Sequence, residues 1–154
     1  MCDRIGEQQF KELLNRIHKD ILKPLGFKKD GSNFRLYHPD GLCKIINFQK
    51  RSYNYWYECE FTINIGIYYE AGEELTNVKF KERQCWLRGR AAQLSPSYRR
   101  DVWWKINALE STDLECIYSE LKSLLEGDVM AWFGQFLSKE EAELMYGSKN
   151  RFAY

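Results

Sequence analysis

The stretch FTINIGIYY, residues 61–69, alternates between large apolar side chains and small ones. Its apolar positions, which fall on one side of an extended chain, are Phe61, Ile63, Ile65 and Ile67. A period of two predicts a half-buried β-strand. The other side carries Thr62 and Asn64 in place of the Lys and Glu that usually solvate an outer face. This choice raises the question of what the small polar side contacts.

Two more strands are predicted upstream of this one, which we extend over residues 58–69. Residues 42–50 and 34–37 are apolar runs rich in β-branched and aromatic side chains. Between them, HPDG at residues 38–41 has Pro second and Gly fourth, as a type I turn prefers. The three strands are expected to form an antiparallel meander. The preceding KKDGSNF, residues 28–34, is predicted to be a turn-rich hinge.

Downstream, residues 70–84 are polar and predicted to form a loop or a short helix. A fourth strand is expected over residues 85–91, with Cys85 and Leu87 facing the core. A fifth is expected over residues 101–106, where Trp103 and Trp104 would point to opposite faces of the sheet.

Helices are predicted at both ends of the chain. Apolar residues recur at helical spacing over residues 7–23, and Pro24 and Gly26 end this pattern. In the C-terminal third, two capping boxes are expected to begin helices, with Gly127 as an interruption and Gly147 as the end of the last helix. The residues of these boxes are Thr112 with Glu115, and Ser138 with Glu141.

This order of elements predicts a single domain over residues 1–154 of the α+β class. Strands and helices occur in separate blocks, which favours a mostly antiparallel sheet of four to five strands with the N-terminal and C-terminal helices packed on one face. A chain of 154 residues is long enough to bury a core without a disulfide or a metal.

Composition restricts the function classes. Lys and Arg number 23 and Asp and Glu 22, so the formal net charge of +1 argues against nucleic-acid binding through the overall field. Five cysteines without a CxxC pair indicate free thiols in a reducing compartment, and thus a cytoplasmic protein. No apolar run approaches 18 residues, so no membrane span is expected.

The first candidate site is a polar face of the predicted sheet. Its residues, which share a face if the strands pair, are Asn47, Gln49, Thr62, Asn64, Arg88 and Arg90. Amides, a hydroxyl and two guanidiniums suit an anionic ligand or the acidic surface of a partner protein. A plain solvated face, or one covered by a helix, remains the alternative.

The second candidate is an aromatic loop between the second and third strands. Tyr53, Tyr55 and Trp56 are residue types that carry energy at protein interfaces and that stack on bases. The alternative is that the loop folds back and its rings join the core.

Catalytic constellations are weak. Cys85, Arg88 and Arg90 do not have the spacing of a thiolate phosphatase loop. Glu58 and Glu60 share a strand face and suit binding of a hard cation or acid–base work. Two such carboxylates also suit a solvated face or ion pairs with Lys50 and Arg51 across the hairpin. No His, Cys and Asp spacing matches a zinc or iron site, and no cofactor is expected.

Five segments in order resemble the bacterial family catalogued as domain of unknown function number 4304. They are KPLGFKKDGSNF (23–34), INFQKRS (46–52), FTINIGIY (61–68), CWLRGR (85–90) and DVWW (101–104). The resemblance covers roughly residues 7–125 and departs from the family pattern at Gly89-Arg90-Ala91. It implies relatives but no activity.

We therefore predict a non-catalytic protein-binding module, in its sharper form a neutralising partner for a toxin or nuclease. The alternative is an anion- or nucleic-acid-binding protein with its phosphate at the polar face and Glu58 and Glu60 as acid–base groups. The expected partner is another protein; a small anionic ligand is the second choice, nucleic acid is less favoured, and no membrane is involved. Convergence of the polar residues in a hollow would favour a ligand.

Overall fold

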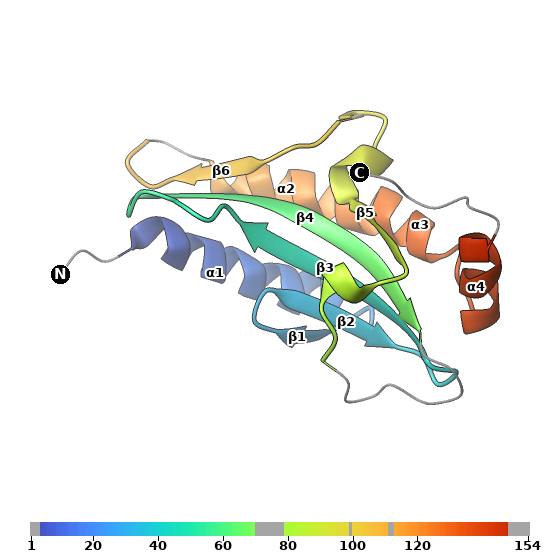
Figure 1. The fold of residues 1–154 in the computed structure, drawn as a ribbon. Helices are drawn as coiled ribbons and strands as arrows, with labels where there is room; N and C mark the ends of the chain where they lie inside the picture. Colours follow the sequence, from blue (N-terminus) through green and yellow to red (C-terminus); the bar gives the residue numbers. More distant parts are fainter. Residues whose placement is uncertain (1–3, 70–78, 99, 111–112, 148–154) are drawn as a thin grey trace.

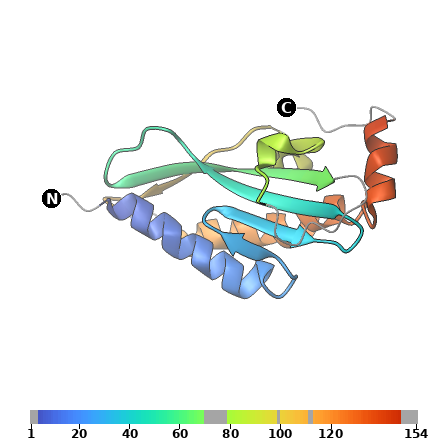
Figure 2. The same cartoon turned by 60° about the horizontal axis from the view of Figure 1, so that its bottom comes forward.

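A twisted antiparallel sheet forms the centre of the protein, and helices cover one of its faces (Figures 1 and 2). The structure is a computed structural model of the chain and describes residues 4–69, 79–98, 100–110 and 113–147. The predicted α+β class, with N-terminal and C-terminal helices beside an antiparallel sheet, is confirmed.

Within the described residues the sheet has six strands. They are β1 (Lys28–Asp30), β2 (Asn33–Tyr37), β3 (Leu42–Lys50), β4 (Glu58–Tyr69), β5 (Leu87–Arg90) and β6 (Trp104–Asn107). Strands β1 to β5 lie in chain order, and β6 pairs with β4. Strand β4 therefore has two neighbours on one side: its first part pairs with β6 and its second part with β5.

The alternating stretch, residues 61–69, makes up all of β4 after its first three residues. Strand β3 pairs with it from Leu42 opposite Tyr69 to Lys50 opposite Phe61. Strands β2, β3 and β4 lie where the sequence predicts them. The predicted hinge at residues 28–34 is instead a β1–β2 hairpin, because Gly31 at φ 61° makes a tight turn that lets the two short strands pair.

The two later strands are shorter than predicted. Strand β5 begins at Leu87, because the 3₁₀ turn η2 (Glu82–Gln84) occupies the residues before it. Cys85 is thus outside the strand and does not share the core face with Leu87. It packs on the opposite face of the sheet, over Gly66. Strand β6 begins at Trp104, which is buried, while Trp103 is half-buried.

The helices are interrupted by wider turns. Helix α1 (Ile5–Ile17) continues into the π turn η1 (His18–Leu22), and α2 (Leu114–Leu124) continues through η4 (Leu125–Val129) into α3 (Met130–Phe133). Gly127 lies inside η4 and does not end the helical run. The 3₁₀ turn η3 (Ala91–Leu94) follows β5, and α4 (Lys139–Gly147) is the last described helix.

The helix caps are partly as predicted. The cap of α2 is Asp113, whose carboxylate accepts a hydrogen bond from Cys116 N at 3.2 Å. The predicted cap Thr112 lies outside the described residues. At α4 the predicted pair is present in part: Ser138 Oγ accepts from Glu141 N at 3.2 Å.

The main core lies between the sheet and α1, α2 and η4. Phe48 and Phe61 of β3 and β4 have ring centroids 6.0 Å apart, and Phe61 also packs on Phe10 of α1 at 5.0 Å. Burying one such side chain contributes about 1.5–3 kcal/mol. Within the described residues, no helix is long and apolar enough to cross a membrane.

Candidate functional site

The open face of the sheet carries a row of polar side chains across four strands. Asn33 of β2 is opposite Asn47 of β3, Asn47 is opposite Asn64 of β4, and Asn64 is opposite Arg90 of β5. Gln49 lies next to this row. Strand pairing thus brings the predicted polar residues together on one face, and adds Asn33, which the sequence analysis did not single out.

These side chains bond to one another. Asn47 Nδ2 donates to Asn33 Oδ1 at 2.8 Å. Asn64 Nδ2 donates to Asn47 Oδ1 at 3.0 Å and to Gln49 Oε1 at 2.9 Å. Arg90 Nη1 donates to Gln49 Oε1 at 3.0 Å and to Asn64 Oδ1. We call the set of Asn33, Asn47, Asn64, Gln49 and Arg90 the amide ladder.

Thr62 is covered by the protein's own chain. Its hydroxyl donates to Val102 O at 2.8 Å, so the segment that leads into β6 lies over it. Thr62 is 1% exposed and Asn64 4%, whereas Gln49 is exposed. The small polar residues of β4 therefore contact other parts of this protein, and any direct contact with a ligand or partner falls to Gln49 and the residues around it.

Both predicted arginines are held by carboxylates. Arg88 donates to the two oxygens of Glu82 at 3.1 and 3.2 Å, and Glu82 is buried. Arg90 lies 3.4 Å from Asp101. The guanidinium carbon of Arg90 lies 5.7 Å from the centroid of the Trp103 ring, and that of Arg51 lies 5.0 Å from it. These contacts fix the guanidiniums as parts of the sheet face, where they satisfy internal acceptors.

A hollow of about 490 Å³ lies above the amide ladder and is lined by all of its members except Arg90. Besides three asparagines and Gln49, it is lined by the Glu82–Arg88 pair and by the exposed Lys81 and Arg83. The polar residues thus converge in a concave region, the geometry that the sequence analysis associates with a ligand. Most of their hydrogen-bonding groups, however, already bond within the ladder.

The two glutamates of β4 are engaged in ion pairs. Glu60 contacts Arg51 at 2.8 Å, as the sequence predicts. Glu58 contacts Lys105 of β6 at 3.1 Å, and the hydrogen bond raises the pKa of Lys105. Lys50 does not pair across the hairpin; it lies 3.6 Å from Glu7 of α1. Paired carboxylates of this kind are typical of a structural rather than an acid–base role.

The buried cysteines are protonated thiols. Burial raises the pKa of Cys43 to about 12 and that of Cys59 to about 11, and it also raises the pKa of Cys85. For Cys85 the charge of Glu82 adds to this effect of burial. A nucleophilic cysteine needs a lowered pKa, so the Cys85–Arg88–Arg90 segment has the wrong electrostatics for thiolate chemistry.

The aromatic loop, residues 51–57, presents its rings to solvent. Tyr53 is 71% exposed, Tyr55 53% and Trp56 39%. Their rings lie against each other: the centroids of Tyr53 and Tyr55 are 5.7 Å apart, and Tyr55 stacks on Tyr57 at 5.6 Å. The alternative in which these rings join the core is therefore wrong.

The loop backbone is anchored although its rings are exposed. Buried Asn54 donates to Arg51 O at 3.1 Å and accepts from Glu60 N at 3.0 Å. Arg4, just before α1, donates to Asn54 O at 2.8 Å, and Gly6 N of α1 donates to Trp56 O at 3.1 Å. The sequence analysis did not single out Asn54. Its only signal in the sequence was that an amide side chain lies between the aromatic residues of the loop.

Helix α1 and the link after β6 add apolar surface beside the loop. A Cβ on Gly6 would lie 2.4–2.6 Å from the backbone of Glu58, so the start of α1 packs directly on β4. Ala108 N donates to Tyr57 O at 2.7 Å. The neighbours of these two anchors, Ile5 and Leu109, are exposed. We call the set of Ile5, Tyr53, Tyr55, Trp56 and Leu109 the aromatic end.

Within the part of the chain that the structure describes, no group of three or more His, Cys, Asp or Glu residues is placed to hold a metal ion. Residues 18–135 match the family described as Domain of unknown function (DUF4304), and the chain belongs to this family. No curated protein and no solved structure matches the chain.

Proposed function

We propose that this protein is a protein-binding module without chemistry of its own, and that the aromatic end is the centre of its contact surface. The observation that carries the proposal is the anchored aromatic loop. Three large rings are exposed while Asn54 and the start of α1 hold the backbone beneath them.

Anchoring matters because ordering a loop on binding costs free energy. A loop already held by hydrogen bonds loses little freedom when a partner docks, so more of the contact energy remains as affinity. Tyr and Trp contribute large contact areas with few rotatable bonds, and they are enriched among the residues that dominate binding energy. The loop combines both properties.

The charges around the aromatic end are compensated within the protein. Arg4 lies 3.2 Å from Glu7, and Arg51 and Lys105 have their own glutamates. Stacking of nucleic-acid bases on aromatic rings usually occurs in a groove with an excess of positive charge. The neutral surroundings instead favour a partner protein with an apolar surface of its own.

The amide ladder supports the proposal indirectly. Its groups bond to one another and to Arg90, so the face is rigid and offers few unused donors. This favours the aromatic end over the hollow above the ladder as the primary contact. Neutralisation of a toxin or nuclease is the sharper form of the proposal, and the free thiols of the four described cysteines support action in the cytoplasm.

The test is affinity capture with matched variants. Immobilised wild-type protein is expected to retain a partner from a cell extract, and Tyr55→Ser/Trp56→Ser is expected to weaken retention by at least about tenfold. Leu144→Ser changes an even more exposed apolar side chain, on α4, and should retain the partner. Retention by the double variant would contradict the proposal.

Self-association needs its own measurement. Sedimentation velocity of the wild-type protein is expected to give a monomer at micromolar concentration. A dimer that Tyr55→Ser/Trp56→Ser dissociates would assign the aromatic end to a second copy of this chain and overturn the proposal of a different partner. Circular dichroism of the variants confirms that each one is folded.

A further inference from the structure

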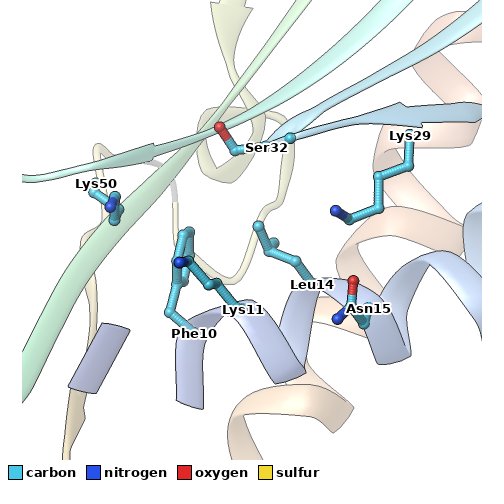
Figure 3. A pocket seen from close by; sticks show the side chains of 8 residues that line it. Phe10, Lys11, Leu14, Asn15, Lys29, Ser32 and Lys50 are labelled. Carbon is cyan, nitrogen blue, oxygen red and sulfur yellow. The ribbon is translucent and has the colours of Figure 1, made fainter. Parts of the chain in front are cut away.

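A second pocket lies on the helix-covered side of the sheet, between α1 and the β1–β2 hairpin (Figure 3). Its volume is about 310 Å³. Phe10 and Leu14 of α1 contribute apolar surface, and Ser32 lies at the hairpin turn. The pocket shares no lining residue with the aromatic end or with the amide ladder.

Three lysines from three different elements line this pocket. Lys11 comes from α1, Lys29 from β1 and Lys50 from the end of β3. In Figure 3, Lys29 and Lys50 flank the pocket on opposite sides, and Lys11 lies on the helix between them. We call this site the lysine pocket.

The positive charge of the lysine pocket is only partly compensated. Glu7 lies 3.6 Å from Lys50 and also contacts Arg4. Across the described residues, no carboxylate is within 4.0 Å of the ammonium group of Lys11 or Lys29. The hollow above the amide ladder also has two exposed cations, Lys81 and Arg83, but its Arg88 is held by both oxygens of Glu82.

The β1–β2 hairpin explains why Lys29 faces the pocket without a carboxylate in direct contact. Lys29 is opposite Phe34, a core residue, so its side chain starts on the helix side of the sheet. The adjacent Asp30 is on the other side, 3.0 Å from Arg35. This hydrogen bond lowers the pKa of Asp30. Asp30, the acidic residue next to Lys29 in the sequence, therefore pairs with Arg35 on the other side of the sheet.

We propose that the lysine pocket binds a small phosphate monoester with an apolar body. Lysine ammonium groups act as point charges that suit a phosphate dianion. A pocket of this volume is at the lower end of the usual range for ligand sites, so the ligand is a single ring or a short chain. That body lies against Phe10 and Leu14, and Ser32 supplies a hydroxyl for the phosphate oxygens.

Phenyl phosphate is a suitable probe, followed by amide chemical shifts of the isotope-labelled protein. Binding is expected to shift the amide signals of Leu14, Lys29 and Ser32 in particular. Inorganic phosphate lacks the apolar body and benzyl alcohol lacks the charge, so each is expected to bind at least about fivefold more weakly. Equal affinity for inorganic phosphate would overturn the proposed ligand class.

Lysine variants locate the site. Lys11→Gln/Lys29→Gln is expected to weaken phenyl phosphate binding by at least about tenfold. Lys19→Gln/Lys23→Gln is the matched control: it removes the same charge from exposed lysines of η1 and its C-terminal cap, outside the pocket. An equal loss in both variants, or shifts confined to the hollow near Lys81, would overturn the proposal.

Discussion

The helix-covered face of β4 and its open face share one backbone but are stabilised differently. From Phe61 to Ile67 the covered face is an unbroken apolar row, packed against β3 and the helices. The open face of the same residues has Thr62, Asn64 and Gly66. Apolar packing is non-directional and scales with buried area, whereas amide hydrogen bonds require particular partners.

This difference bears on strand register. A one-residue slip of β3 along β4 would move every isoleucine to the wrong face, so the apolar row alone excludes it. A two-residue slip would keep the apolar side chains on the covered face and the polar side chains on the open face. It would, however, separate Asn47 from Asn64 and leave buried amide groups without partners. The apolar row thus excludes a one-residue slip, and the amide ladder excludes the two-residue slip that the apolar row would allow.

The largest loss of stability is expected on the covered face. Ile65→Ala should lower the free energy of unfolding by about 2–5 kcal/mol, because it leaves a cavity beside fully buried neighbours. Urea denaturation measures the change, with Leu144→Ala on the exposed side of α4 as the control. A loss for Ile65→Ala no greater than that of the control would contradict the assignment of this face as the core.

Gly66 tests the closest packing on the open face. An added Cβ would lie 2.7 Å from Cys85 Sγ and 2.9 Å from Cys85 Cβ. We expect Gly66→Ala to cost about 1–3 kcal/mol through overpacking. Removing the sulfur with Cys85→Ala should relieve part of this strain, so the double variant should lose less than the two single losses combined. Additive losses would rule out the contact.

Breaking the amide ladder is expected to lower the free energy of unfolding by a similar amount. Asn64→Ala removes the donor to Asn47 and the acceptor for Arg90, with a loss of about 1–3 kcal/mol. Asn47→Ala/Asn64→Ala removes both members of one bond, so its cost should fall below the sum of the singles. A double-mutant cycle in urea measures this coupling, and a coupling near zero would show that the ladder does not act as a unit.

The smallest effect is expected at the aromatic end. Tyr53→Ser should change the free energy of unfolding by less than about 0.5 kcal/mol, since the ring is exposed and Asn54 holds the loop. Thermal unfolding followed by circular dichroism is sufficient. A larger loss would mean that the ring supports the fold, and would weaken the argument that it is exposed for a partner.

The regular parts of this fold could be predicted because they depend on local patterns. Strict alternation placed β4 and an apolar run placed β3, and the period of two along each strand put Asn47 and Asn64 on one face. Strand β1 could not be predicted from KKDGSNF, because a three-residue polar strand exists only through its pairing with β2. Likewise, Cys85 left the expected face because η2 shifts the start of β5.

The candidate surfaces were only partly predictable for the same reason. The aromatic residues were visible in the sequence, but their exposure depends on Arg4 and Gly6, about fifty residues upstream of the loop atoms they contact. The lysine pocket combines α1, β1 and the end of β3, which come together only in the folded sheet. Contacts between distant segments therefore determine the exposure of the aromatic residues and the assembly of the lysine pocket, which local sequence patterns do not predict.

The lengths of the strands also bear on solubility. The long, isoleucine-rich β4 has 12 residues and β3 has nine, and both lie inside the sheet. The outer positions are taken by β1, β5 and β6, with three or four residues each and at least one Lys or Arg. Short, charged edge strands offer few unpaired N–H and C=O groups to another chain. The segment most prone to amyloid-like pairing is thus shielded by strands that end too soon to recruit a neighbour.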